Sequence, residues 1–215
     1  MEKDLGNYRK SYEKEALEES KISDNPIQQF QTWFYEVEAS ETVDEANAMS
    51  ISSIGLDGFP KTRVVLLKKY YEEGFVFYTN YDSEKGRAIA AHPEVCLSFF
   101  WPSMERQVII KGLAEKLPAA VSDNYFDSRP LGSRLGAMVS PQSQVIDSRA
   151  VLEDSLKSLE AQAVEGQVKR PDHWGGYLVR PKSIEFWQGR PNRLHDRIRY
   201  SLEEDLNWTV ERLAP

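Results

Sequence analysis

Hydrophobic positions change their spacing several times along the chain, and the spacing predicts the elements. Residues 1–23 are polar and charge-dense with little periodicity, and we interpret them as a mobile N-terminal arm. Over residues 27–37 apolar side chains recur every three or four positions, which predicts an amphipathic helix. The preceding Asp-Asn-Pro at 24–26 supplies a capping side chain and a proline for the first turn of this helix. Acidic residues 41–47 are expected to form a loop.

The middle of the chain alternates between short β-branched or aromatic runs and turn residues, which predicts strands. The expected strands are 48–54, 61–70, 75–80, 95–101 and 106–117. A short helix is expected at 83–93, ended by Pro93. Strands this closely spaced and joined by short turns favour an antiparallel barrel over a parallel sheet.

The last third of the chain begins with helical spacing and then returns to strands. Short helices are expected at 118–129 and 133–140, and a longer amphipathic helix at 148–164. One side of the long helix bears Val151, Leu152, Leu156, Leu159 and Ala163. The segments GGYLVRP, SIEFWQG, RIRYS and NWTVERL are expected to be strands. The fold class is therefore α+β, with one domain over residues 24–215.

Composition narrows the class of protein. The 215 residues have a formal net charge of −7, which argues against a general nucleic-acid binder and makes a structural or nucleic-acid module the least favoured alternative. One cysteine, Cys96, excludes an internal disulfide, and three histidines make a structural zinc site unexpected. No apolar run is long enough for a membrane helix, and the N-terminus lacks the apolar core of a secretory signal, so a cytoplasmic location is expected.

The segment 190–199, RPNRLHDRIR, is a basic run in this acidic chain. It holds Arg190, Arg193, Arg197 and Arg199 against Asp196. One interpretation is an anion site, because guanidinium groups bind phosphate or carboxylate in a bidentate manner. The other is a solvated edge strand whose arginines pair with surface acids. Both interpretations remain open from the sequence.

A second basic set, Arg63, Lys68, Lys69, Lys85 and Arg87, flanks the central strands. Arg63 and Lys68 are five residues apart, so on a regular strand their side chains point to opposite faces. They meet at one ligand only if the strand twists strongly or the site lies at its edge. Ser83 is a candidate helix cap; whether that helix N-terminus also binds phosphate stays open.

Other polar and aromatic residues extend the list of candidates. Tyr125, Arg129 and Ser133 share one helical face if the helix continues past Pro130, and they suit a phosphate ester. His195 lies between two arginines, which favours a neutral imidazole. Trp187 is either a stacking surface for a planar ring or core. No serine-hydrolase order, HExxH, Walker A or Rossmann glycine pattern is found. These features together indicate binding of small phosphorylated molecules.

Nine segments, in order along the chain, resemble the pyridoxamine 5′-phosphate oxidase family. They are RVVLLK (63–68), FYTN (77–80), ERQV (105–108), YFDSRP (125–130), GAMVSPQS (136–143), HWGGY (173–177), IEFWQG (184–189), RLHDR (193–197) and ERLAP (211–215). The resemblance covers roughly residues 25–215 and implies an antiparallel split β-barrel with peripheral helices. It also implies a homodimer in which residues of both subunits line two FMN sites at the interface.

The resemblance assigns roles to individual residues. For FMN it implies Arg63, Val64, Val65, Leu66, Lys68, Tyr78, Thr79, Lys85, Gln107, Gln142, Ser143, Trp187 and Arg197. For the substrate it implies Arg9, Tyr12, Lys68, Tyr125, Arg129, Ser133, Arg193, Leu194 and His195. Arg193 and His195 are the expected catalytic residues, with His195 as an orienting hydrogen bonder, and the N-terminal arm resembles the family's lid.

This chain departs from the family pattern at two positions. Glu84 replaces the usual arginine of a Ser-Arg-Lys run, which is expected to weaken phosphate binding if it points inward; Arg87 is a candidate to compensate. Arg134 stands where the family commonly has glutamine.

The resemblance implies that the chain oxidises pyridoxamine or pyridoxine 5′-phosphate to pyridoxal 5′-phosphate, with O₂ as acceptor and hydrogen peroxide as by-product. FMN performs the electron chemistry, and the protein supplies orientation and electrostatics. Two alternatives remain open: another FMN-dependent split-barrel oxidoreductase, such as a flavin reductase, and a non-catalytic protein that binds FMN or pyridoxal phosphate.

Overall fold

The computed structural model describes residues 3–163 and 167–215, and the chain divides into two compact units. Unit 1 comprises Met1–Met49, Leu97–Lys111 and Pro181–Pro215, and unit 2 comprises Ser50–Cys96 and Gly112–Arg180. The division does not test the expected single domain over 24–215, which stays a prediction, as does the mobility of the arm at 1–23.

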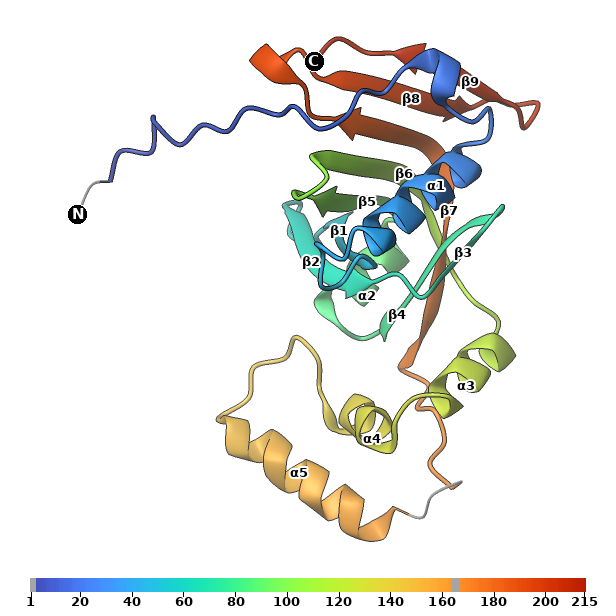
Figure 1. Cartoon of the computed structure of the whole chain (residues 1–215). Helices are drawn as coiled ribbons and strands as arrows, with labels where there is room; N and C mark the ends of the chain where they lie inside the picture. Colours follow the sequence, from blue (N-terminus) through green and yellow to red (C-terminus); the bar gives the residue numbers. More distant parts are fainter. Residues whose placement is uncertain (1–2, 164–166) are drawn as a thin grey trace. The chain divides into compact units, whose positions relative to one another are not determined.

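Helices and strands alternate in blocks along the chain (Figure 1). The α-helices are α1 (Pro26–Ala39), α2 (Glu84–Ala91), α3 (Ala119–Asp127), α4 (Leu131–Val139) and α5 (Arg149–Gln162), with short 3₁₀ turns η1 (Glu19–Lys21) and η2 (Pro191–Arg193). The strands are β1 (Ala48–Ile54), β2 (Pro60–Leu66), β3 (Lys69–Tyr71), β4 (Gly74–Asn80), β5 (Glu94–Trp101), β6 (Arg106–Lys116), β7 (Trp174–Gln188), β8 (Asp196–Leu202) and β9 (Trp208–Arg212). The predicted α+β class is confirmed.

Helix α1 begins where the sequence predicts. The Asn25 side chain accepts hydrogen bonds from the backbone N–H groups of Ile27 and Gln28, and Pro26 occupies the first turn. Its apolar face is buried within unit 1, where the Phe30 ring lies 5.2 Å from that of Phe99. The three- and four-residue spacing therefore identified a face that packs in the core.

The pairs β3–β4, β4–β7, β7–β8 and β8–β9 are antiparallel, as predicted. Strand β4 pairs with the first part of β7, and β8 pairs with both the second part of β7 and β9. The expectation of two separate strands at GGYLVRP and SIEFWQG is wrong, because β7 runs unbroken for 15 residues through Pro181. Pro181 lies between the β7 residues that pair with β4 and those that pair with β8, so neither of these two ladders needs an N–H donor at this position.

The predicted single strand at 61–70 is also wrong. Strand β2 ends at Leu66 and β3 begins at Lys69. At the break the chain changes partner, because β2 pairs with β1, whereas Lys68 already donates its N–H to the Val76 carbonyl of β4 at 2.8 Å. The rule that Arg63 and Lys68 face opposite ways therefore does not apply across this break.

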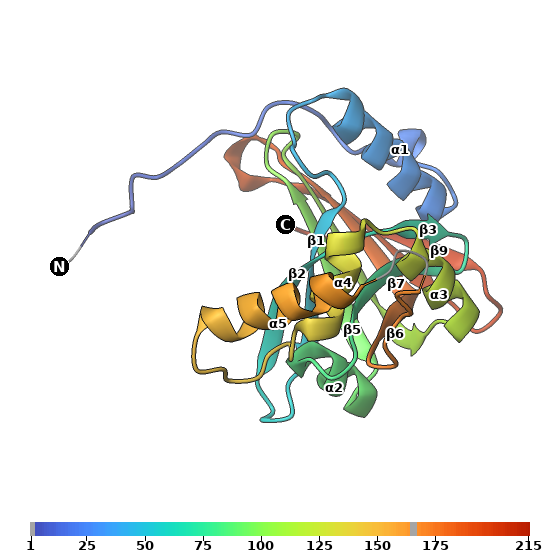
Figure 2. The ribbon, with the colours of Figure 1, turned by 90° about the horizontal axis from the view of Figure 1, so that it is seen from below.

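The helices of unit 2 gather around a small apolar cluster. Helices α4 and α5 lie side by side (Figures 1 and 2). Leu156 and Leu159 of α5 pack against the cluster of buried Phe126, Leu135, Val168 and Trp174. Helix α4 starts two residues earlier than predicted because Pro130 precedes its first turn. The last residue of the helix expected at 148–164 lies outside the described residues.

Helix α2 begins directly after Ser83, which caps it as predicted. The fully buried Ser83 hydroxyl accepts the Gly86 N–H at 3.2 Å and donates to the Asn80 carbonyl at 2.6 Å. A Ser83→Ala variant is expected to lose about 1 kcal/mol of unfolding free energy, the usual cost of losing a helix cap. Urea denaturation measures this loss, with Ser155→Ala on the exposed α5 as control at less than about 0.5 kcal/mol. Equal midpoints for the two variants would contradict the capping role.

Candidate active site

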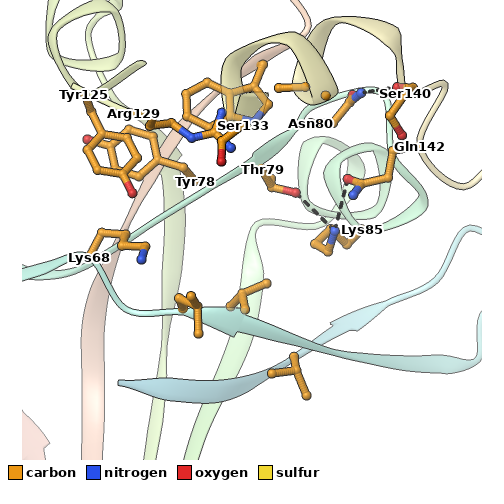
Figure 3. A pocket seen from close by; sticks show the side chains of 16 residues that line it. Lys68, Tyr78, Thr79, Asn80, Lys85, Tyr125, Arg129, Ser133, Ser140 and Gln142 are labelled. Carbon is orange, nitrogen blue, oxygen red and sulfur yellow. Dashed lines mark hydrogen bonds between the residues drawn. The ribbon is translucent and has the colours of Figure 1, made fainter. Parts of the chain in front are cut away.

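Unit 2 contains a cavity of about 440 Å³ between the β2–β3 break, β4 and the helices α3 and α4 (Figure 3). Its polar lining residues are Lys68, Tyr78, Thr79, Asn80, Lys85, Tyr125, Arg129, Ser133, Ser140 and Gln142. Val64, Val65, Leu66, Gly136, Ala137 and Trp174 complete the wall. Among these described lining residues there are three cationic side chains and no carboxylate. The cavity is therefore suited to an anion.

Lys85 and Arg129 lie in this cavity and form no ion pair with any residue that the structure describes. The Lys85 ammonium donates to Thr79 Oγ1 at 3.1 Å and to Gln142 Oε1 at 3.5 Å, both neutral acceptors. Burial lowers the pKa of Lys85, with Arg63 adding to the effect. Arg129 Nη1 is buried and has no hydrogen-bond partner among the described residues, and burial lowers the pKa of this guanidinium. A bound phosphate would satisfy both groups.

One wall of the cavity is a stack of aromatic rings. The Tyr78 and Tyr125 rings lie 3.9 Å apart at 21°, and Tyr78 stacks on Trp174 at 5.5 Å. The Arg129 guanidinium lies 4.6 Å from the Trp174 ring centroid, a cation–π distance. A Cβ at Gly176 would lie 2.8 Å from the Tyr78 ring, so the absence of a side chain there lets this ring sit against β7.

Burial raises the pKa of Tyr78 to about 12, and it also raises the pKa of Tyr125. Both phenols therefore remain neutral hydrogen-bond donors at physiological pH.

The three residues Tyr125, Arg129 and Ser133 line one cavity, although they do not share one helix. Helix α3 ends at Asp127, and α4 begins at Leu131 after Pro130. The break separates the helices but keeps the three side chains on the same wall. The three side chains therefore line one cavity, as their spacing predicted, although two helices and the residues between them, rather than one continuous helix, place them there.

Glu84 does not line the cavity but instead lies in an ion-pair cluster with two cations. Its carboxylate pairs with Lys61 at 3.2 Å and with Arg63 at 3.1 Å. The Arg63 side chain is 56% exposed and is not among the cavity-lining residues. Arg87 is exposed and also lies outside the lining, and its compensating role stays a prediction.

Two further predicted positions lie beside the cavity lining. Arg134 is buried in α4 with Nε unpaired among the described residues, and it is not a lining residue. Ser143 follows the lining residue Gln142 and has a left-handed backbone, with φ of 72°. The roles of Arg63 and Ser143 stay predictions.

Unit 1 has its own cavity, of about 600 Å³, at the loop that follows β7. It is lined by Tyr8, Arg9, Lys10, Ser11, Tyr12, Arg190, Asn192, Arg193 and His195. Four of the predicted substrate-binding residues, Arg9, Tyr12, Arg193 and His195, therefore share one cavity. Leu194 is exposed and is not a lining residue.

The loop at 190–195 has an unusual backbone that orients its side chains. Asn192 and Arg193 both adopt left-handed conformations, with φ of 57° and 62°, which are uncommon for residues other than glycine and frequent at functional sites. The Arg190 backbone N–H donates to His195 Nδ1 at 3.1 Å. His195 therefore bears a lone pair on Nδ1, as expected for a neutral imidazole whose proton is on Nε2. Its ring lies 4.7 Å from Trp187.

The basic run divides according to its partners. Arg190 forms an ion pair with Asp196 at 3.6 Å. Arg197 pairs with Glu185 at 2.8 Å, and Arg199 pairs with Glu211 at 2.6 Å. The interpretation as an edge strand with paired arginines therefore fits Arg197 and Arg199. Among these four arginines, Arg193 alone has no ion pair with the described residues, and it lines the cavity.

Two more residues expected to contact FMN lie in unit 1. Gln107 donates to Ser98 Oγ at 3.2 Å, and Arg197 also donates to the Ala214 carbonyl at 2.8 Å. The Glu185 hydrogen bond raises the pKa of Arg197. These two side chains and Trp187 are thus held in place by their neighbours, while their roles toward FMN stay predictions.

Sequence reasoning missed Trp174 and Asn80 as site residues. Both lie in segments that carry the family resemblance, HWGGY and FYTN, but nothing in the spacing marks them as lining residues. Trp174 supports Arg129, and Asn80 reaches the Ser140 carbonyl with its side-chain amide at 3.4 Å.

Two family models match this chain in succession. Residues 36–163 match the model described as pyridoxamine 5′-phosphate oxidase, and residues 174–215 match the model described as the pyridoxine 5′-phosphate oxidase C-terminal dimerisation region. The chain belongs to the pyridoxamine 5′-phosphate oxidase family. The resemblance drawn from the nine motifs is therefore confirmed.

Curated relatives and solved structures agree with this family. The chain is 63% identical to the pyridoxine/pyridoxamine 5′-phosphate oxidase of Flavobacterium psychrophilum over 99% of its length and 100% of the relative. It is 64% identical to the same-named protein of Flavobacterium johnsoniae over 98% of its length and 99% of the relative.

Two solved structures share the fold. One is PhzG from Burkholderia lata in complex with tetrahydrophenazine-1-carboxylic acid, with TM-score 0.85 and 26% identity over 91% of this chain and 95% of that one. The other is a pyridoxamine 5′-phosphate oxidase-related, FMN-binding protein from Nostoc punctiforme, with TM-score 0.71 and 14% identity over 90% of this chain and 100% of that one. The split-barrel prediction is confirmed by these neighbours.

Residues 3–163 and 167–215 contain neither a membrane-spanning helix nor a cluster of metal ligands. No helix there combines the length and the apolar character needed to span a bilayer. No group of three or more histidine, cysteine or acidic side chains there is arranged to hold a metal ion.

Proposed function

We propose that this chain is an FMN-dependent oxidase that converts pyridoxamine or pyridoxine 5′-phosphate to pyridoxal 5′-phosphate. In the proposed reaction the C4′ carbon loses a hydride and its nitrogen or oxygen substituent loses a proton, and O₂ takes up the two electrons and two protons to become hydrogen peroxide. With pyridoxamine 5′-phosphate, water then hydrolyses the resulting imine, and ammonia leaves. The observation that supports it most directly is the set of cations around the unit 2 cavity, Lys68, Lys85 and Arg129, with no lining carboxylate. The names of the relatives point to the same substrates.

The residues of the unit 2 cavity fit the phosphate chemistry of FMN and of the substrate. Lys85, Thr79 and Gln142 form one polar group, joined by hydrogen bonds of 3.1 and 3.5 Å. They would hold FMN together with Tyr78 and the β2 backbone at 64–66. Lys68, Tyr125, Arg129 and Ser133 would hold the substrate phosphate, which supplies the acceptor that the buried Arg129 Nη1 lacks.

Bound FMN supplies a two-electron acceptor that O₂ can reoxidise. The protein's part is to fix the substrate by its phosphate, a remote handle whose binding energy orients the reacting carbon. The Arg193 guanidinium would position the substrate and stabilise the charge that develops during hydride transfer. The Nε2 proton of His195 would donate a hydrogen bond to the substrate, since Nδ1 already accepts one from Arg190.

We further propose that the protein acts as a homodimer with FMN at the subunit interface, in which Gln107, Trp187 and Arg197 complete the flavin site. The match of residues 174–215 to a dimerisation region supports this. So does the exposure of large apolar side chains in both units, such as Val64 at 71% and Phe100 at 55%. Light scattering of the purified protein tests the dimer. The expected cytoplasmic location stays a prediction.

Colour and product formation test the proposed function directly. The purified protein is expected to show flavin absorbance and, with pyridoxamine 5′-phosphate in air, to form the aldehyde chromophore and hydrogen peroxide. A flavin protein that oxidises NAD(P)H but leaves the vitamin phosphate unchanged would instead be the alternative oxidoreductase. A protein that binds FMN or pyridoxal phosphate without turnover would be the binding protein.

The Glu84 ion pairs lead to a prediction about FMN affinity. In a Glu84→Gln variant, Arg63 loses its anionic partner and becomes available to the FMN phosphate, whereas Lys61 keeps its pair with Asp57 at 3.1 Å. The expected dissociation constant falls a few-fold, because partly exposed ion pairs are worth about 0.2–1 kcal/mol. Quenching of flavin fluorescence on titration of the apoprotein measures it. Glu115→Gln, which removes the surface pair with Arg180, is the control; weaker or unchanged FMN binding by Glu84→Gln would contradict the prediction.

A further inference from the structure

An extended segment of unit 1, residues 10–17, forms neither a helix nor a strand (Figure 1). Its first three residues line the unit 1 cavity. We call it the strap. Its Tyr12 ring occupies the space that a side chain at position 189 would need, because a Cβ on Gly189 would lie 2.8 Å from Tyr12 Cγ. The same ring lies 5.8 Å from the rings of Trp187 and His195. Tyr12 therefore lines the cavity only while the strap stays in this position.

One carboxylate, that of Glu105, holds the middle of the strap. Its Oε2 accepts the backbone N–H groups of Glu13 at 2.9 Å and Lys14 at 3.1 Å, and its Oε1 lies 3.5 Å from the Lys10 ammonium. The Glu105 side chain is only 2% exposed. The strap is not part of a sheet, so no neighbouring strand accepts hydrogen bonds from these N–H groups. The Glu105 carboxylate accepts them instead.

The main chain of Glu105 is fixed to the strand that bears the site. Its carbonyl accepts the Gly189 N–H at 2.7 Å and the Gln188 Nε2–H at 3.2 Å. Its φ of 56° is left-handed, a conformation that costs free energy for a residue with a side chain. Glu105 thus joins the end of β7 to the strap, by its backbone on one side and its carboxylate on the other.

Two further anchors lie toward the other end of the strap, where Arg190 donates to the Glu15 carbonyl at 3.0 Å. The Leu17 N–H donates to Asp196 Oδ2 at 3.1 Å, and the Leu17 carbonyl accepts from Arg212 at 2.8 Å. The hydrogen bonds recorded for residues 4–9 are local to that stretch. Glu105 is therefore the anchor nearest to Tyr12 and Arg9.

We propose that Glu105 is a positioning residue that holds the strap closed over the substrate cavity, so that Tyr12 and Arg9 stay beside Arg193 and His195. Glu105 does not line the cavity, and it acts on the substrate only through the strap. Its effect on substrate binding rests on the proposed function, whereas its effect on the strap does not.

The Glu105→Gln variant tests the proposal, because it keeps the size of the side chain and removes its charge. Trypsin is expected to cleave after Lys10 and Lys14 about tenfold faster than in the parent, the factor that corresponds to losing one charged hydrogen bond. The KM for pyridoxamine 5′-phosphate is expected to rise by a similar factor, while kcat at saturation changes less than about twofold. Glu115→Gln removes an exposed carboxylate of β6 and is expected to leave both measurements unchanged.

A second variant guards against a general loss of folding. Gly189→Ala leaves Glu105 intact but places a Cβ against Tyr12, so the same faster cleavage is expected. Unchanged cleavage in both variants overturns the proposal, and so does a KM in Glu105→Gln equal to that of the parent. If the parent itself does not oxidise pyridoxamine 5′-phosphate, the proposed function fails, while the cleavage rates still decide the role of Glu105.

Discussion

An Arg193→Ala variant is expected to slow the reductive half-reaction by about 10²–10³-fold, the usual cost of losing one group that stabilises transition-state charge. Of the four arginines in the basic run, Arg193 alone has no ion pair with the described residues. Its left-handed backbone belongs to the loop that brings it beside His195 in the cavity. Anaerobic stopped-flow measurements of flavin absorbance, with saturating pyridoxamine 5′-phosphate, measure the rate.

Arg199→Ala is the matched control for this experiment. Arg199 lies in the same basic run, but it pairs with Glu211 on the neighbouring strand β9. Its loss is expected to change the rate less than about twofold, because surface ion pairs contribute little. If Arg193→Ala reduced the flavin at the parent rate and reached half-saturation at the same substrate concentration, Arg193 would have no role in substrate positioning or charge stabilisation.

An Arg129→Ala variant is expected to raise the KM for pyridoxamine 5′-phosphate by about 10²-fold, since removing one partner of a buried charge pair costs about 2–5 kcal/mol. Arg129 stacks on Trp174 and has a buried, unpartnered Nη1 in the cavity wall. Because the proposed ligand is the phosphate, the variant should also lose the preference for the phosphorylated substrate over free pyridoxamine. Initial rates with both substrates measure the preference.

The control for Arg129 is Arg180→Ala, which removes an exposed arginine of unit 2 that pairs with Glu115. It is expected to leave the KM and the substrate preference unchanged. An Arg129→Ala enzyme with the parent's KM would reject Arg129 as a phosphate ligand, whereas a higher KM with both substrates alike would indicate a general disturbance of the cavity.

Local signals predicted the elements well where the interaction that forms them is also local. The Asn25 cap, the Ser83 cap and the apolar spacing of α1 each involve residues a few positions apart, and each is confirmed. The break between β2 and β3 was missed because it arises from a change of strand partner, from β1 to β4. Hydrophobic and β-branched residues continue through that break, so spacing alone gives no sign of it.

The candidate site shows the same limit for side chains. The charge of Glu84 is visible in the sequence, but its partners Lys61 and Arg63 lie about twenty residues away, and only the fold brings them together. The support that Trp174 gives Arg129 likewise depends on packing between α3 and the start of β7. The motif resemblance identified the segments, and the structure adds which neighbours hold each side chain.

The close contact at Gly176 limits how this cavity can diverge among related proteins. A side chain there would meet Tyr78 on one side and Leu117 on the other, at 2.8 and 2.6 Å. Any larger residue at this position would therefore displace the Tyr78 ring from the aromatic wall of the cavity. A directed-evolution library for this cavity would therefore keep the glycine.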